Sequence, residues 1–209
     1  LGGMFAVWND LVGNGISVKD IHHRVFPSLE TMAMKTWNAN PLITFDIFDS
    51  NRMALSEAPG VNQLGRIGDK PGLVYETANV QPGAKLPFPE IGYNYTVTFD
   101  LDAQSEALGT ELFRSPDAVF YLSDPVSGLF GFDGYLNTFG FSPYPGEKIN
   151  VRIEGDPLST SLYINGKLFK KLDVQMQFYN SGKDSMKYIR TLVFPLEKAG
   201  NFKSRITNL

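Results

Sequence analysis

The chain has 209 residues, a formal net charge of −3 and no cysteine, and 43% of its residues are hydrophobic, which is typical of a globular protein with a sizeable core. The charge argues against nucleic acid or an anionic membrane as the main partner, and no apolar run approaches the ~20 residues of a membrane span. Without cysteine, and with His22 and His23 as the only histidines, the sequence has no disulfides and lacks the usual ligands of a zinc cluster.

The first predicted element is a short apolar strand over residues 4–7, which follows glycines and ends at Trp8-Asn9-Asp10. An apolar strand that ends in aromatic and carboxylate side chains and leads through a loop into a helix is typical of one βα unit of an α/β barrel. In such barrels the chemistry lies at the C-terminal ends of the strands. The stretch therefore predicts the last part of a barrel.

Residues 18–37 are predicted to form a helix, because a capping-box-like pair, Ser17 and Asp20, is followed by apolar residues at intervals of three to four. Pro27 lacks the amide hydrogen that a helix interior needs, so we expect a kink there or two short helices that meet at Phe26. Thr44 is placed to cap a second helix from residue 45 to about residue 56.

Beyond residue 72 the hydrophobic pattern alternates, most clearly in residues 95–101, which predicts a half-buried strand. Asn165-Gly166 is a strong hairpin signal, because both central positions of a type I′ turn need positive φ. Roughly nine or ten short strands at even spacing predict an antiparallel β-sandwich. The expected strands cover residues 73–76, 95–101, 118–122, 135–141, 148–154, 161–164, 167–172, 190–194 and 202–207.

The fold class that follows is mainly β: an antiparallel sandwich preceded by a helical segment that is the last βα unit of a TIM barrel. The predicted parts are residues 1–38, the last strand and helix of the barrel; residues 39–72, a helix and linker; and residues 73–209, the sandwich.

GGMFAVWND and the later IHHRVFPSL together resemble the end of the catalytic barrel of family 20 glycoside hydrolases, the β-N-acetylhexosaminidases and lacto-N-biosidases. The shared features are Trp-x-Asp/Glu at the end of the last strand and an Ile-His-x-Arg-Val-Phe-Pro-like helix. The resemblance implies that Trp8 lines the pocket of the terminal sugar and that Asp10 binds the hydroxyls of that sugar. The catalytic Asp-Glu pair of this family, which acts by a substrate-assisted route, is absent from these 209 residues, so no catalytic residue is assigned.

Residues 73–209 resemble a concanavalin A-like or laminin-G-like jelly roll, through the hairpin LYINGKL at 162–168 and the closing stretch GNFKSRI at 200–206. Such sandwiches serve as lectins, carbohydrate-binding modules or spacers. Tyr135 and Tyr144, with Phe139 and Phe141, are candidates for a glycan platform in a glycine-rich segment. The alternative is that these residues simply fill the core.

Asp124, Asp133 and Asp156 raise the question of a calcium site, but each stands beside proline or glycine, which favours turn chemistry. No metal ion and no cofactor is assigned.

The leading functional hypothesis is the C-terminal fragment of a glycosidase that removes terminal N-acetylhexosamine or lacto-N-biose from glycans, with an accessory sandwich. Its implied partners are an N-acetylhexosamine-containing glycan and the rest of the catalytic barrel. The family resemblance also implies a secreted or cell-surface bacterial enzyme. Two alternatives stay open: a lectin-like module in its own right, and a structural support domain.

Overall fold

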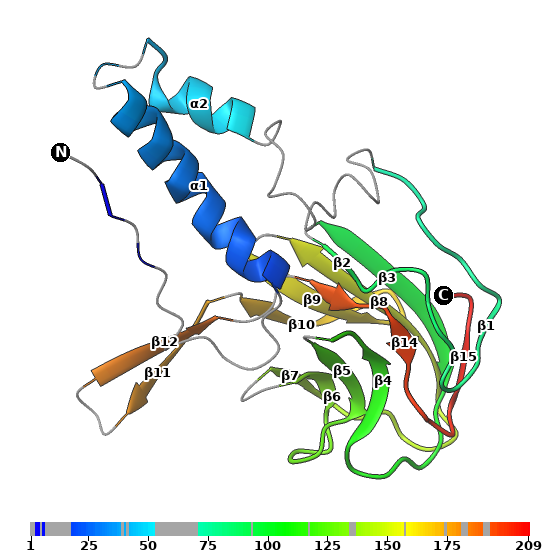
Figure 1. The fold of residues 1–209 in the computed structure, drawn as a ribbon. Coiled ribbons are helices and arrows are strands. Elements are labelled where there is room, and N and C mark those ends of the chain that lie inside the picture. Colours follow the sequence, from blue (N-terminus) through cyan, green and yellow to red (C-terminus); the bar gives the residue numbers. More distant parts are fainter. Residues whose placement is uncertain are drawn as a thin grey trace. The chain divides into compact units, whose positions relative to one another are not determined.

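The chain divides into two compact units, one of Leu1–Asp10 with Val18–Gly72 and the other of Leu11–Ser17 with Leu73–Leu209 (Figure 1). A computed structural model describes residues 3–4, 6, 18–38, 40, 42–52, 71–92, 94–116, 118–133, 137–156, 158–173, 175–180, 184–189 and 193–209.

The first unit contains two helices, α1 (Val18–Trp37) and α2 (Phe45–Arg52). The helix α1 runs through Pro27 without interruption, so of the two alternatives expected there, a kink or two short helices, the second is wrong. A proline removes its own hydrogen bond from the ladder, and the bonds on either side carry the helix past it. Thr44 caps α2 as predicted, because its Oγ1 accepts the amide hydrogen of Ile47 at 3.4 Å. The predicted end of this helix near residue 56 lies outside the described residues.

The predicted first strand is not formed in the part of it that is described. Met4 and Ala6 belong to no strand, and the Met4 side chain is 92% exposed. A strand of a parallel barrel is held by backbone hydrogen bonds to neighbouring strands, and its side chains are covered by helices. Met4 and Ala6 are both exposed, unlike the side chains of such a strand. Within the described residues, no helix combines the length and apolarity that crossing a bilayer requires.

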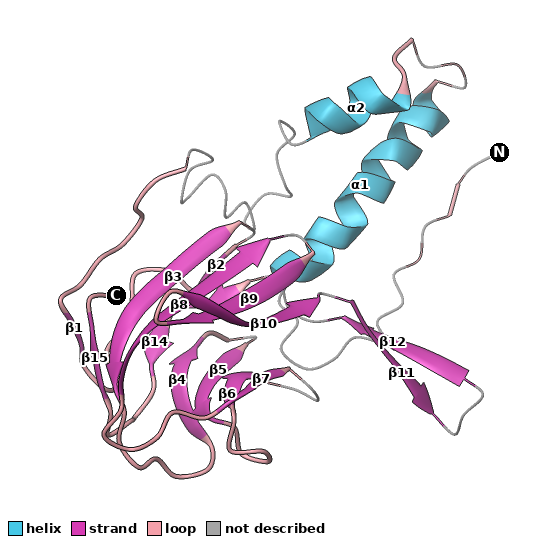
Figure 2. Ribbon diagram, turned by 180° about the vertical axis from the view of Figure 1, so that it is seen from behind, coloured by secondary structure: helices cyan, strands magenta, loops and turns pink. Residues whose placement is uncertain are grey.

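The larger sheet of the second unit has six antiparallel strands, and Figure 2 shows its long strands in magenta. In β3 every second side chain, from Tyr95 to Leu101, is buried, whereas those between are exposed or half-buried, as the alternating sequence predicts. The strands lie in the order β1 (Asn79–Val80), β15 (Arg205–Thr207), β3 (Tyr95–Asp102), β8 (Lys148–Asp156), β9 (Ser159–Ile164) and β10 (Lys167–Asp173).

A second antiparallel sheet has five strands, and two short pairs complete the unit. Its order is β14 (Lys198–Ala199), β4 (Thr110–Arg114), β5 (Val119–Ser123), β6 (Phe130–Phe132) and β7 (Thr138–Phe141). The short pairs are β13 (Phe194–Pro195) with β2 (Glu90–Ile91), and β11 (Gln175–Asn180) with β12 (Asp184–Ile189).

The core between the two main sheets is built from phenylalanine side chains. Phe99 of the larger sheet packs against Phe113 of the smaller one, with ring centroids 6.0 Å apart. Phe194 joins both sheets, because it contacts Tyr95 of β3 as well as rings of β4, β5 and β6. The centroid distances from Phe194 are 5.8 Å to Tyr95, 5.7 Å to Phe113, 5.1 Å to Phe120 and 6.0 Å to Phe132. The unit is therefore an antiparallel β-sandwich, which confirms the predicted fold class of this part.

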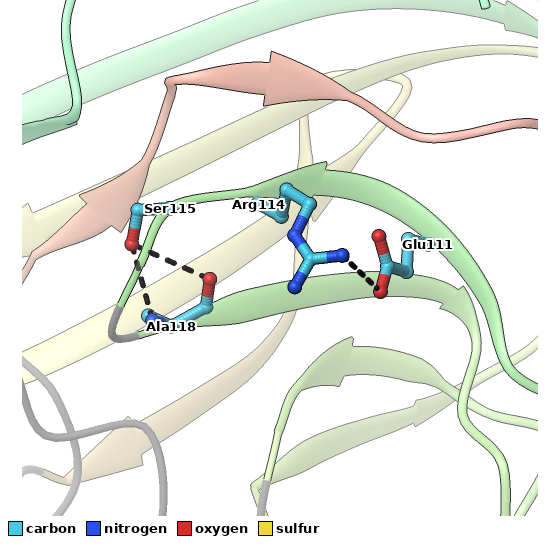
Figure 3. Close-up of polar contacts among 4 residues, drawn as sticks. All are labelled: Glu111, Arg114, Ser115 and Ala118. Atoms are coloured by element: carbon cyan, nitrogen blue, oxygen red, sulfur yellow. Dashed lines mark hydrogen bonds and ion pairs between the residues drawn. The ribbon is translucent and has the colours of Figure 1, made fainter. Parts of the chain in front are cut away.

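Two turns show how local sequence sets the strand connections. Asn165 and Gly166 have φ angles of 49° and 77°, which confirms the predicted hairpin between β9 and β10. Between β4 and β5 the Ser115 hydroxyl oxygen accepts the amide hydrogen of Ala118 at 3.1 Å, and Arg114 pairs with Glu111 at 3.4 Å (Figure 3).

A carboxylate anchors the start of the last strand. Glu106 Oε1, in the loop after β3, accepts hydrogen bonds from the amide groups of Lys203 and Ser204 at 2.9 and 2.7 Å, and from the Ser204 hydroxyl at 2.7 Å. This one side chain fixes the turn from which β15 enters the larger sheet.

Several strand predictions need correction. Residues 73–76 form no strand, because backbone pairing with the end of the chain begins only at Thr77, whose amide donates to Leu209 O. The strand expected at 202–207 begins at Arg205, and β4, β6 and the β11–β12 hairpin were not predicted. Of the strand expected at 190–194, Phe194 belongs to β13, Val193 precedes that strand, and 190–192 lie outside the described residues.

Candidate functional site

Polar side chains gather on the outer face of the larger sheet, away from the phenylalanine core. Because β-strand side chains alternate and the register is known, residues on adjacent strands form rows across this face. We call this surface the outer polar face. Its three rows are Thr207–Asp100–Asn150, Arg205–Asp102–Lys148 and Thr98–Arg152–Tyr163, which cross β15, β3, β8 and β9.

The first two rows line a hollow of about 470 Å³, which we call the polar hollow. Its side chains include two carboxylates, Asp100 and Asp102, and two cations, Lys148 and Arg205, so its formal charge is balanced. Neighbouring strands are about 4.8 Å apart, and successive outward residues of one strand are about 7 Å apart. The polar groups are thus spread over an area that several sugar-sized rings could cover.

Asp100 is the best-restrained carboxylate of the polar hollow. Its Oδ1 accepts a hydrogen bond from Asn150 Nδ2 at 2.9 Å, and its Oδ2 accepts one from Asn208 Nδ2 at 2.7 Å. These two donors lower the pKa of Asp100 below its usual 3.8, although slight burial opposes the shift. The Asn150 backbone is held in turn, because its N–H donates to Asn165 Oδ1 at 2.9 Å.

The two cations of the polar hollow make weaker contacts. Lys148 Nζ lies 3.5 Å from Asp102 Oδ2, and the lysine side chain is 79% exposed. Arg205 Nη2 donates to Asn79 Oδ1 at 3.3 Å. Exposed ion pairs of this kind contribute little to stability. Lys148 and Arg205 can therefore turn toward a ligand at small cost.

The third row carries the aromatic group of the outer polar face. The Arg152 guanidinium carbon lies 4.1 Å from the centroid of the Tyr163 ring, within the range of a cation–π contact. Arg152 also pairs with Glu154 at 3.2 Å. A hydrogen bond with the Glu154 carboxylate raises the pKa of the Tyr163 phenol, and desolvation by burial adds to the shift. Arg152 and Glu154 thus hold the tyrosine ring in a defined orientation.

The structure describes only some of the residues proposed from sequence. Trp8, Asp10 and Tyr135 lie outside the described residues, so their roles stay predictions. Tyr144 follows β7; its side chain is 78% exposed and its N–H donates to Glu147 Oε2 at 3.0 Å. Phe139 is fully buried, 6.3 Å from the Phe120 ring, so a platform role for it is wrong and the core interpretation is right.

Of the three aspartates considered for calcium, Asp124 and Asp156 act in turns. Asp124 Oδ1 accepts from the amides of Val126 and Ser127 at 3.0 and 2.7 Å. Asp156 Oδ1 accepts from the amides of Leu158 and Ser159 at 2.6 and 2.7 Å. Burial would raise the pKa of Asp156, but hydrogen bonds from Leu158 and Ser159 outweigh it and lower that pKa. In the part of the chain that the structure describes, no cluster of three His, Asp or Glu side chains could hold a metal ion.

The polar hollow was not predicted from the sequence. The alternation in residues 95–101 does indicate that Thr98 and Asp100 face away from the core. What the sequence does not reveal is the pairing of β3 with β8 on one side and β15 on the other. Those pairings bring Asn150 and Asn208 to Asp100 across 50 and 108 residues of chain.

No family model matches the sequence, and no curated protein matches it. Among solved structures, domain 4 of an extracellular GH43 arabinanase from Geobacillus stearothermophilus, in complex with arabinotriose, has a TM-score of 0.36 at 14% sequence identity. The alignment covers 68% of this chain and 78% of that one.

Proposed function

We propose that the second unit is an oligosaccharide-binding module whose ligand lies in the polar hollow. The single observation that carries this proposal is the hydrogen-bonded set of Asp100, Asn150 and Asn208 at that hollow. A carboxylate and side-chain amides offer acceptors and donors that match pairs of sugar hydroxyls. Because the three side chains already hold one another, little conformational freedom is lost when a ligand binds.

The charge of the polar hollow favours an uncharged ligand. Asp100 and Asp102 balance Lys148 and Arg205, so neither an anion nor a cation gains a net attraction. Nucleic acid needs a basic surface, whereas the whole chain has a net charge of −3. A neutral molecule rich in hydroxyl groups fits the balance of charges and hydrogen-bonding groups. Tyr163 and Arg152 supply a flat side-chain pair at the next row for the apolar side of a sugar ring.

A glycan array probed with the full chain tests this proposal. We expect a set of neutral oligosaccharides to bind, and Asp100→Ala and Asn150→Ala to reduce that binding. Asp46→Asn is the matched control, because this exposed carboxylate lies on α2, outside the second unit. If the array stays blank at high ligand density, or if both variants bind like the unchanged chain, the proposal is wrong and a structural support role remains.

A second, finer proposal concerns the first unit. We infer that the chain is the C-terminal part of a family 20 glycosidase that releases terminal N-acetylhexosamine or lacto-N-biose, as in a secreted or cell-surface bacterial enzyme. Its support is the Trp8-Asn9-Asp10 motif together with the helix-forming stretch that follows it, which folds as α1. The Asp-Glu pair that would do the chemistry is not among these 209 residues.

The test of this second proposal uses a longer parent chain that includes the coding sequence upstream of Leu1. Release of N-acetylhexosamine or lacto-N-biose is expected, with Trp8→Ala and Asp10→Ala raising KM or lowering kcat. Asp46→Asn again serves as control. Unchanged kinetics in both site variants would contradict the roles assigned to Trp8 and Asp10.

A further inference from the structure

A second hollow lies beside the polar hollow along the same strand. It has a volume of about 570 Å³ and lies between Thr96 and Thr98 of β3 and the segment of residues 73–78. Thr98 lines this hollow and Asp100 lines the polar one, and the two are successive outward residues of β3, about 7 Å apart. The two hollows therefore adjoin on one face of the sheet.

Seven of the thirteen residues that line this second hollow have aliphatic side chains, and we call it the apolar hollow. Leu73 and Val74 line it and are 78% and 43% exposed, and the buried residues Ile91 and Leu196 also line it. A concave site of several hundred Å³, mostly apolar with a few polar groups, has the properties of a small-ligand site. Covering exposed aliphatic groups removes apolar surface from water, which favours an aliphatic occupant.

The wall of the apolar hollow is tied to the end of the chain. The Thr77 amide donates to Leu209 O at 2.7 Å, the Leu209 amide donates to Thr77 O at 3.1 Å, and the Asn208 amide donates to Ala78 O at 3.2 Å. Asn208 lines the apolar hollow, and its side chain donates to Asp100 of the polar hollow at 2.7 Å. A residue that lines the apolar hollow is thus hydrogen-bonded to a carboxylate that lines the polar hollow.

We propose that the apolar hollow takes a short aliphatic chain, alkyl or acyl, attached to a sugar whose ring lies in the polar hollow. This inference rests on the proposed oligosaccharide-binding function and names its ligand class as an aliphatically substituted glycoside. The continuity of the two hollows through Asn208 and along β3 is what selects this occupant. A free sugar leaves Leu73 and Val74 in water, whereas a substituted one covers them.

Titrations of the full chain with matched glycosides, followed by NMR, test the inference. The probes are the methyl and hexyl β-glycosides of glucose, galactose and N-acetylglucosamine, used below the concentration at which the hexyl compounds self-associate. Each fully buried methylene raises affinity about fourfold. Because burial in an open hollow is partial, we expect the hexyl glycoside of a bound sugar to bind at least about tenfold more tightly than the methyl glycoside.

Variants show which residues cause the higher affinity for the hexyl glycoside. Leu73→Ser and Val74→Ser should remove the preference for the hexyl glycoside and leave binding of the methyl glycoside unchanged. Leu108→Ser and Val126→Ser make the same changes at exposed loop positions next to the smaller sheet, and they should keep the preference. Asp100→Ala should weaken both glycosides by the same factor, because it acts on the sugar ring.

Four results would overturn the inference. Equal affinities for methyl and hexyl glycosides would refute it while the oligosaccharide proposal stands. If Leu73→Ser and Val74→Ser leave binding of the hexyl glycoside unchanged, the hexyl group binds outside the apolar hollow. If Asp100→Ala leaves that binding unchanged, the sugar ring of the hexyl glycoside does not bind in the polar hollow. Failure of all hexyl glycosides to bind also refutes it, and the glycan array then decides the proposed function separately.

Discussion

Asn208 and Asp100 are 108 residues apart in the sequence and are joined by a hydrogen bond of 2.7 Å. The bond fixes a carboxylate on the outer polar face from the far end of the sandwich unit. We predict that Asn208→Ala lowers oligosaccharide affinity about three- to tenfold, because one hydrogen bond that orients Asp100 is lost. Isothermal titration measures the change. Asn201→Ala, at an exposed position that lines neither hollow, should bind normally, and equal losses in the two variants would argue against the assigned role.

The affinity for oligosaccharide should also depend on pH. The pKa of Asp100 in the folded chain is lowered by the Asn150 and Asn208 donors, so the interaction is fully present above the usual value of 3.8 and is lost as pH falls through the folded-state pKa. Oligosaccharide affinity should therefore stay constant from about pH 8 to 5 and decrease only below the ordinary aspartate range. Titrations over this range, with circular dichroism to confirm folding, check the profile. A midpoint near neutrality would mean that another group controls binding.

The Phe194 side chain should be among the most sensitive positions of the sandwich core. It is fully buried and contacts aromatic rings from both sheets. Phe194→Ala should lower the free energy of unfolding by about 3–5 kcal/mol, the usual cost of a large cavity. Urea unfolding followed by fluorescence measures this. Phe169→Ala, whose ring is 48% exposed, is the control and should cost clearly less; similar losses would remove the central role of Phe194.

A glycine marks a close approach of two backbones. Gly200 is buried, its amide donates to Leu112 O at 3.0 Å, and a Cβ at this position would overlap the carbonyl group of Glu111. Gly200→Ala should therefore destabilise the chain by about 1–3 kcal/mol, because the added methyl forces β14 away from β4. Gly72→Ala, where a Cβ meets no atom within 4 Å, should be nearly neutral. Thermal unfolding of both variants would show the difference, and equal melting temperatures would contradict it.

Local sequence patterns predicted those strands of the sandwich in which one face is buried and the other is exposed. The alternation from Tyr95 to Leu101 indicated β3, and the positive φ angles of Asn165 and Gly166 follow from the type I′ preference for these residues. The β4 strand escaped notice because Leu112 and Phe113 are consecutive and both buried, at a register shift that breaks the alternation. Pro27 shows the opposite case, in which a local signal for a break is overridden within a long helix.

Local sequence patterns could not predict the candidate site, for a different reason. Each of its rows combines strands that are distant in sequence, and strand order is set by global packing of the core. Thr98, Arg152 and Tyr163 are unremarkable polar or aromatic residues until β3, β8 and β9 lie side by side. The predicted platform at Phe139 failed for the same reason, since only the assembled sandwich reveals which face of β7 is covered.

The position of β15 has a consequence for how the chain is made. This strand has three residues, yet it stands between β1 and β3, and its entry turn is held by Glu106. During synthesis β3 leaves the ribosome long before β15, so until β15 follows, the backbone groups of residues 100–102 on that side of β3 lack their strand partner. A nascent or prematurely terminated chain therefore exposes an edge that can pair with another copy, and completion of the sheet is a late step that protects the protein from aggregation.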